Sequence, residues 1–467
     1  MSAAKKSAAF LEGSILRHIS VMSASSGAGL LAIFLVDFAD LFFISLLGAS
    51  ALAAAVGYAG TVLFFFTSIG IGLAIAMGAL TARALGREDT DRAREVAGSV
   101  AAIVIGVGLV LTAVLMIYAP TFLTWLGAEG EAHEYATSYL RIAGAGTPFL
   151  MLGMAGGAVL RSHGDARRAM NTTLSSAVIN ALLDPLFIFG FGWGLDGAAL
   201  ATFMARVTLA VVAWRPILLL YNGAARPRIA RVIQDFTPVF AIAGPALLTN
   251  VATPVGNAFI TRLISSFGTE AVAGYAVIGR LTPLAFCLIF GLSGAVGPII
   301  GQNFGAGKIE RVRETLFKAL VLAGAYVVLV SLALFLLRWP LADLFDASDE
   351  ARALIFLFCG PLSLAFAFNA ALFTTNAAFN NLDRPFTSTV VNWGRHTLGT
   401  VPFAWLGAEI MGAQGVLIGQ YAGGALFAVV GVFLAFRLID RHDPNVPTAG
   451  ADPVERVPQS PFSNWRP

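Results

Sequence analysis

Apolar side chains fill long blocks of this chain, and short polar stretches separate the blocks. The blocks hold Leu, Ala, Val, Ile and Phe without the strict alternation of apolar and polar residues that marks a membrane-spanning strand. A helix needs roughly 20 such residues to cross a bilayer. The pattern therefore predicts about twelve membrane-spanning helices, near residues 14–47, 50–82, 93–119, 131–160, 167–191, 195–222, 236–266, 270–302, 311–338, 349–380, 385–409 and 412–437.

The predicted segments form two sets of six that resemble each other. "GREDTDRARE" from Gly86 matches "GAGKIERVRE" from Gly305, and "GLDGAALAT" from Gly194 matches "GAQGVLIGQ" from Gly412. Because the offset stays near 218–220 residues, the chain reads as an internal repeat. Six helices per half give both halves the same orientation, so an axis along the membrane normal should relate them. We predict an all-α polytopic membrane protein with two pseudo-symmetric six-helix lobes.

Polar stretches set the expected boundaries of the lobes. A cytoplasmic N-terminus covers 1–13, and the N-terminal lobe covers 14–222. The basic stretch at 223–235 should be a cytoplasmic linker before the C-terminal lobe at 236–437. The tail at 438–467 is rich in proline and polar residues, so we expect it to be disordered.

Composition agrees with a membrane protein. The chain has 467 residues, of which 57% are hydrophobic and 12% charged, with a mean hydropathy of +0.78. A soluble domain usually carries about twice that charged fraction. The formal charge of +3 gives no reason to expect a nucleic-acid partner. We expect membrane lipids around the chain, a small-molecule substrate, no cofactor and a monomer.

Lys and Arg gather in alternate connections, which indicates the orientation of the helices. The intervening connections are short and neutral, or acidic as in "GAEGEAHE". The positive-inside rule then places both termini in the cytoplasm and the helices in the inner membrane. The basic connections hold Arg87, Arg92, Arg94, Arg167, Arg168, Arg226, Arg228, Arg231, Lys308, Arg311, Arg313 and Arg384.

Five polar residues stand out inside the apolar segments of the first half. Asp37 and Asp40 lie three residues apart in "VDFADLFF", where an ionised carboxylate costs roughly 2.5 to 3.5 kcal/mol. Asn180 and Asp184 lie four residues apart and therefore share one helix face. Thr202 follows in the sixth segment. Two carboxylates in one low-dielectric pocket resist joint ionisation, so a nearby pair is expected to hold a proton.

Each of these residues also has a structural explanation. Asp184 can be a buried hydrogen-bonded group or a helix-end cap beside Pro185, and Asn180 can bond between helices. Thr202 can bond the carbonyl of its own preceding turn. Asp37 is either a second cavity carboxylate or a solvated residue near the central cleft.

Several stretches resemble the multidrug and toxic compound extrusion (MATE) family of transporters. They are "VDFADLFFISLLGASALAAA", "GIGLAIAMGALTARALGREDTDRAR", "LRSHGDARRAMNTTLSSAVINALLDPLFIFG", "GLDGAALAT" and "IIGQNFGAGKIERVRE". The match spans nearly all of the chain from about residue 14 to 437. It implies a twelve-helix antiporter that exports a substrate in exchange for H⁺ or Na⁺.

The resemblance also implies a site. The family's cation-site pattern falls on Asp40, Asn180, Asp184 and Thr202, and Tyr139 would add a hydroxyl beside Asp184. The same oxygens suit a proton or Na⁺, so the coupling ion stays open.

The second half lacks the acidic pattern. At an offset of 220, Asp37 corresponds to Asn257 and Asp40 to Ile260, and the eleventh segment carries Arg395 and His396 instead of a carboxylate. The resemblance is therefore to the DinF-like branch of the family, with coupling confined to the first lobe.

The first segment departs from the family in one respect. Members commonly have a proline well before the aspartate, where this chain reads "SASSGAGLL", although Pro245 stands at the matching place in the second half. Any bend would have to be glycine-based, at Gly27 or Gly29.

The leading hypothesis is secondary active export of amphiphilic, often cationic organic compounds, and not an enzymatic activity. No ATP-binding motif is visible, so an ion gradient must supply the energy. A lipid-linked saccharide flippase is the alternative, with Arg262, Arg280 and Arg395 as candidates to hold a diphosphate. A passive channel or a receptor has no need of a carboxylate cluster in one lobe only.

Overall fold

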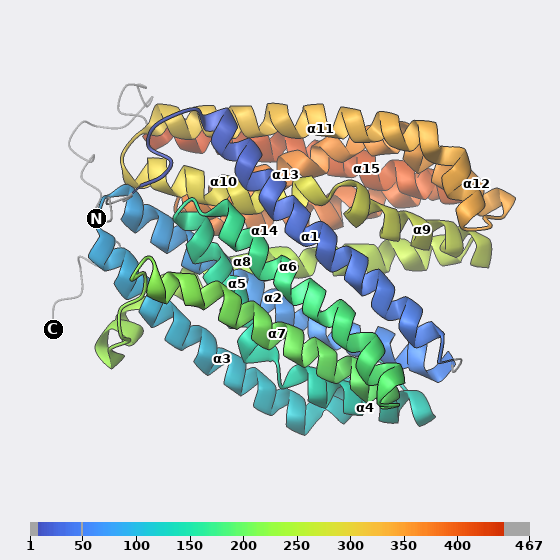
Figure 1. Cartoon of the computed structure of the whole chain (residues 1–467). Helices are drawn as coiled ribbons and strands as arrows, with labels where there is room; N and C mark the ends of the chain where they lie inside the picture. Colours follow the sequence, from blue (N-terminus) through green and yellow to red (C-terminus); the bar gives the residue numbers. More distant parts are fainter. Residues whose placement is uncertain (1–7, 48–49, 443–467) are drawn as a thin grey trace.

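The computed structural model describes residues 8–47 and 50–442. The described part of the chain folds into helices joined by short turns and contains no strand, which confirms the predicted fold class (Figure 1). The first lobe comprises α1 (Ile15–Ser45), α2 (Ser50–Gly86), α3 (Thr90–Trp125), α4 (Gly130–Gly144), α5 (Thr147–Ser162), α6 (Ala166–Pro185), the π-helical turn η1 (Leu186–Gly190) and α7 (Gly194–Leu219).

The second lobe repeats this order with additional breaks. It comprises α8 (Ile229–Ser265), α9 (Thr269–Ala285), α10 (Cys287–Gly305), α11 (Ile309–Leu344), α12 (Asp349–Leu357), η2 (Phe358–Leu362), α13 (Ser363–Asn381), α14 (Pro385–Gly394), η3 (Arg395–Gly399) and α15 (Thr400–His442).

Within the described residues, ten helices are long and apolar enough to span a membrane, or eleven if the pair α4 and α5, bent by 48°, is one span. One of them, over 385–442, has 58 residues and is too long for a single crossing. It breaks at Gly412, whose φ of 61° and ψ of −141° are not helical. A Cβ on Gly407 would lie 2.0 Å from the carbonyl oxygen of Gly415, so the two halves pack closely after the break. The break makes two spans of this helix, as the sequence predicts.

Two expected boundaries are wrong. The second half of the predicted linker at 223–235 is helical, because α8 begins at Ile229. The predicted tail at 438–467 begins inside α15, which continues to His442. The remaining prediction for the tail falls on 443–467, outside the described residues, as does the start of the N-terminal segment, 1–7.

The first helix of each lobe packs on the other lobe. α1 lies against α10 as well as against α6, and α8 lies against α2 as well as against α14. A Cβ on Gly27 would lie 3.0 Å from the Cα of Leu288, and one on Gly72 would lie 2.6 Å from the carbonyl oxygen of Ala243. α1 is one uninterrupted helix through Gly27. Glycine here permits close helix packing, and α1 has no break at Gly27 or Gly29 in this structure.

The first helix of each lobe also contributes side chains to the hydrophobic core of the other lobe. Ile15, Ile19 and Met22 at the start of α1 belong to the core of the second lobe. Val239 and Ile242 of α8 belong to a core of the first lobe. The lobes are therefore joined by two helices that each serve both cores.

Inter-lobe hydrogen bonds lie at one face of the bundle. Phe10 and His442 both contact the last turns of α10 there, so we call it the terminal face. Gln302 donates to the carbonyl of Ser162 at 2.7 Å. Among the residues that the structure describes, no inter-lobe hydrogen bond lies elsewhere, and the lobes separate toward α4 and α12 (Figure 1).

Candidate cation-binding site

Two parallel helices bring the predicted carboxylates together. α1 and α6 touch at Gly29, where a Cβ would lie 2.1 Å from Oγ1 of Thr173. Asp40 follows Gly29 by eleven residues, and Asp184 follows Thr173 by the same number. Eleven residues are just over three helical turns, so each aspartate returns to the face that makes the contact. The close contact at Gly29 thus sets the register in which the two carboxylates meet.

Asn180 bridges the two carboxylates. Its Nδ2 donates to both oxygens of Asp40, at 3.2 and 3.1 Å, and to Oδ2 of Asp184 at 2.8 Å. The carboxyl groups of Asp40 and Asp184 also interact with each other directly, and Oδ1 of Asp184 is buried without a hydrogen-bond partner among the described residues. Asp184 is fully buried and Asn180 is 7% exposed. The structure thus unites three of the four residues predicted for cation coupling.

The orientation of Asn180 bears on which cation the site takes. The amide turns its NH₂ group toward both carboxylates, so it supplies donors and no metal ligand. Na⁺ binding would require the amide to rotate until its oxygen faces the pair, because sodium takes oxygen ligands.

Tyr139 and Thr202 form a second polar contact beside the acid pair. Their side chains share a hydrogen bond, and the tyrosine interacts electrostatically with Asp40, Asp184 and Arg206. Among the described residues, neither hydroxyl is hydrogen-bonded to either carboxylate. Thr202 therefore contacts Tyr139 and forms no hydrogen bond with the acid pair itself.

Arg206 is a residue that the sequence reasoning missed. It is half-buried in α7, four residues after Thr202, and its Nη1 donates to the carbonyl of Ala143 at 2.6 Å. The signal was present, because an arginine in "GAALATFMARVTLAVV" is as unusual in a membrane span as an aspartate.

Asp37 does not join the acid pair. Its side chain is exposed, and it forms no hydrogen bond or ion pair within the described part of the chain. It lies three residues before Asp40, on a neighbouring line of the helix surface, and the charge of Asp40 acts on it through space. Whether Asp37 supports transport stays a prediction.

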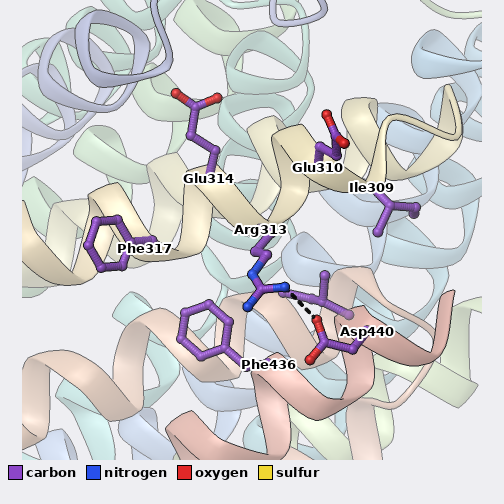
Figure 2. Close-up of a pocket in the computed structure, with 8 residues that line it drawn as sticks. Ile309, Glu310, Arg313, Glu314, Phe317, Phe436 and Asp440 are labelled. Carbon is purple, nitrogen blue, oxygen red and sulfur yellow. Dashed lines mark hydrogen bonds and ion pairs between the residues drawn. The ribbon is translucent and has the colours of Figure 1, made fainter. Parts of the chain in front are cut away.

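A separate hollow lies at the terminal face, within the second lobe. It has a volume of about 600 Å³ between α11 and α15. Figure 2 shows Arg313 reaching across it to Asp440, at 3.1 Å, while Glu310 and Glu314 point away from that pair. None of the predicted site residues lines it.

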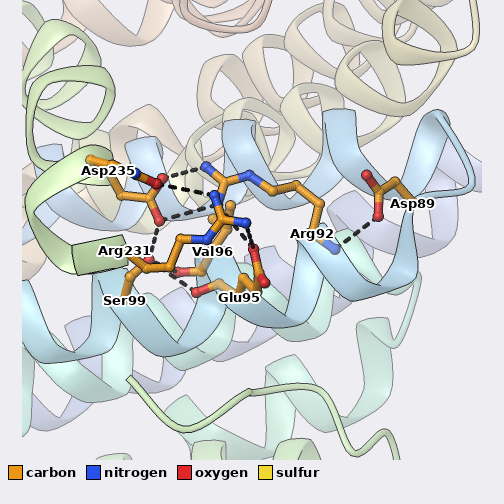
Figure 3. Close-up of polar contacts among 8 residues, drawn as sticks. Asp89, Arg92, Glu95, Val96, Ser99, Arg231 and Asp235 are labelled. Carbon is orange, nitrogen blue, oxygen red and sulfur yellow. Dashed lines mark hydrogen bonds and ion pairs between the residues drawn. The ribbon is translucent and has the colours of Figure 1, made fainter. Parts of the chain in front are cut away.

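A second ionic cluster joins α3 to the start of α8 at the terminal face (Figure 3). Asp235, which is 1% exposed, accepts hydrogen bonds from Arg92 and from the hydroxyl of Ser99. Arg231 pairs with Glu95 at 3.2 Å beside it. The sequence analysis placed Asp235 in a cytoplasmic linker and gave no sign of this burial.

The repeat has an equivalent contact on the other side. Arg311, which lies 219 residues after Arg92, donates to the carbonyls of Phe10 at 3.0 Å and Gly13 at 3.3 Å. These two arginines therefore hold the starts of α8 and α1, the two helices that serve both cores.

Comparison with known proteins gives a consistent family. A family model described as MatE matches residues 26–186 and 245–406. The chain is 29% identical to a FAD transporter of Shewanella oneidensis over 443 residues, which cover 92% of this chain and 96% of that protein. It is 24% identical to the multidrug export protein MepA of Staphylococcus aureus, over 86% and 89% of the two chains. The crystal structure of a Vibrio cholerae MATE transporter, 25% identical, superposes with a TM-score of 0.87 over 92% of this chain and 98% of that chain.

Proposed function

The chain belongs to the MatE family of efflux transporters, and from that premise we propose that it exports amphiphilic organic compounds in exchange for protons. Sodium is the competing choice of coupling ion. Placement in the DinF-like branch stays a prediction. The observation that carries the proposal is the contact of Asp40, Asn180 and Asp184.

The acid pair offers a physical link between proton binding and helix packing. Ionisation of both carboxyl groups would leave two negative charges in contact, and at about 4 Å their repulsion is roughly 4 kcal/mol for an effective dielectric constant of about 20. This repulsion acts between α1 and α6. Because Ile15 and Ile19 of α1 sit in the core of the second lobe, strain at Asp40 reaches the contact between lobes.

The terminal face carries an excess of arginine and lysine, which supports its assignment to the cytoplasm under the positive-inside rule. The helices would then lie in the inner membrane with both termini inside. With inter-lobe bonds on that face and the lobes separated on the other, the conformation corresponds to an outward-facing state.

Efflux from proteoliposomes under imposed pH and Na⁺ gradients, tested separately, examines the proposal. Asp40→Asn and Asp184→Asn should each abolish gradient-driven efflux of ethidium. Asp196→Asn is a matched control, because Asp196 lies in the same lobe but bonds only Ser138. Normal efflux in either coupling variant would refute the site, and flux that needs no gradient and no aspartate would indicate a channel.

A second candidate substrate is FAD, favoured by the resemblance to the Shewanella transporter over nearly all of both chains. Fluorescence of FAD taken up by inside-out vesicles under a proton gradient tests it. If the vesicles take up no FAD while ethidium efflux is intact, FAD is rejected as a substrate and the exporter proposal stands.

A further inference from the structure

Arg395 places a positive charge deep in the second lobe. It is the first residue of η3, ten residues after α14 begins at Pro385. α14 begins at the terminal face, where Arg83 contacts Asn380 and Asp383. Ten helical residues rise about 15 Å, which is half of a hydrocarbon core of about 30 Å. Arg395 therefore lies near mid-membrane depth, where transporters of repeated architecture hold their substrates.

The guanidinium of Arg395 has no counter-charge. Its Nε is buried without a hydrogen-bond partner, and no described residue forms an ion pair with it. Tyr421 interacts electrostatically with the guanidinium. A Cβ placed on Gly424 of α15 would lie 3.6 Å from Nε of Arg395. The described acidic residues of this lobe lie near its two faces: Asp235, Glu270, Glu310, Glu314, Asp343, Asp346, Asp349, Glu350, Asp383, Glu409 and Asp440.

The neighbouring histidine has unused polar atoms as well. His396 is 4% exposed, and neither of its ring nitrogens has a partner. Its ring packs on α8, where a Cβ on Gly256 would lie 2.1 Å from Nδ1. Buried polar groups are nearly always hydrogen-bonded, so each of these side chains lacks an expected partner, Arg395 on the side of α15 and His396 on the side of α8. Both lie in a π-helical turn, a local geometry that often marks functional sites.

Other arginines within the helices differ from Arg395 in their exposure or in the helix that they contact. Arg262 and Arg280, two candidates for holding a diphosphate, are exposed. Arg161 of α5 is half-buried and reaches α10, where a Cβ on Gly294 would lie 3.7 Å from its Nε; it also has no ion-pair partner among the described residues. The interior thus carries unpaired positive charge, while the carboxylates of the first lobe are occupied with one another.

We propose that Arg395 anchors a subsite for an oxyanion group of the transported compound, a phosphate carried on an aromatic body. The guanidinium presents donors in a planar fork that matches two oxygens of a phosphate. The phenol of Tyr421, which acts on that charge, offers an aromatic side chain for the body of the ligand. The subsite rests on the export function proposed above and specifies its substrate class.

Flavin mononucleotide and riboflavin are suitable probes, because they share a fluorescent ring and differ by one phosphate. The full chain in phosphatidylcholine proteoliposomes should bind flavin mononucleotide at least about tenfold more tightly than riboflavin. Arg395→Gln should remove that preference, Arg395→Lys should retain part of it, and Arg262→Gln should leave it unchanged. Each of the three variants should elute from size-exclusion chromatography in detergent as the unmodified protein does, which reports that it is folded, and ethidium efflux should persist in Arg262→Gln.

Equal binding of the two flavins, or an unchanged preference in Arg395→Gln, would overturn the subsite while leaving the exporter proposal intact. Loss of proton-driven ethidium efflux in the unmodified protein would instead refute the exporter proposal. The binding assay repeated with phosphatidylglycerol in the bilayer separates the two phosphate sources. If the preference for flavin mononucleotide over riboflavin disappears in phosphatidylglycerol, Arg395 binds a lipid headgroup and its role in substrate binding is overturned.

Discussion

Replacing Asp383 by asparagine should weaken the contact between the lobes at the terminal face. Arg83 of α2 pairs with Asp383 across the lobes and donates to the carbonyl of Asn380 at 3.2 Å. The arginine side chain is 11% exposed and the aspartate 61%. Asp383→Asn therefore leaves a buried guanidinium without its counter-charge in the closed arrangement, whereas separation of the lobes would let water reach it.

The size of the effect follows from the exposure of the two partners. A pair of charges at about 4 Å gains roughly 4 kcal/mol at an effective dielectric constant of about 20. Solvent around the exposed Asp383 reduces this gain, and we take about half of it, ~2 kcal/mol. That amount changes the equilibrium between closed and open terminal faces by about 30-fold.

The double variant Arg83→Gln with Asp383→Asn supplies an internal check. It removes the buried charge together with its partner, so the penalty of an unpaired guanidinium disappears. We expect the double variant to lie closer to the unmodified protein than Asp383→Asn does.

Cysteine labelling measures the opening directly. Ala82 is fully buried, and a Cβ on Gly301 of α10 would lie 2.9 Å from its side chain. Ala82→Cys, in a chain with Cys287 and Cys359 replaced by alanine, should react with an impermeant maleimide only when the lobes part. Applied to the terminal face, the reagent should label the Asp383→Asn protein about 30-fold faster.

Asp440→Asn is the matched control for this experiment. Asp440 pairs with Arg313 at 3.1 Å on the same face, but both residues belong to the second lobe. Its loss should not change the labelling of Ala82→Cys. Equal labelling rates in the Asp383→Asn and Asp440→Asn proteins would refute the reasoning.

Two further variants test the first lobe. Asp37→Asn should reduce proton-driven ethidium efflux less than Asp40→Asn does, because Asp37 is exposed and outside the acid pair. Normal efflux in Asp40→Asn together with loss of efflux in Asp37→Asn would show that the register assigned to α1 is wrong. Burial alone would raise the pKa of Asp165, but hydrogen bonds from Tyr221 and Arg168 outweigh it and hold that pKa below its ordinary value. The carboxylate therefore contributes fully at neutral pH and loses its contribution as the pH falls through its lowered pKa, so Asp165→Ala should cost about 1 kcal/mol of thermal stability at pH 7 and less near pH 3.

Sequence patterns predicted the elements and part of the site for identifiable reasons. Apolar blocks fix membrane spans, and the spacing of Asn180 and Asp184 fixes a shared face whatever lies opposite. The partner of that face depends on how α1 and α6 pack, and the close approach of Gly29 to Thr173 has no signature in either segment alone. The contact of the acid pair could therefore be expected only through the family resemblance.

The start of α8 was mispredicted because its sequence is basic and partly exposed. Ile229 and Ile233 are 81% and 68% exposed, so the first turns lack the apolar face on which the prediction relied. Burial of Asp235 against Arg92 and Ser99 holds these turns instead. Such a long-range contact overrides local composition, and nothing in "RPRIARVIQD" reveals it.

The internal repeat preserves donors more faithfully than acceptors. Arg92 and Arg311 are in register, yet one binds the carboxylate of Asp235 and the other binds the backbone carbonyls of Phe10 and Gly13. A guanidinium accepts either partner, so the alignment of the two halves identifies the arginines and leaves their partners undetermined. The consequence is a physical asymmetry. A single substitution at Asp235 removes the acceptor that holds α8, whereas no side-chain replacement removes the carbonyls that hold α1.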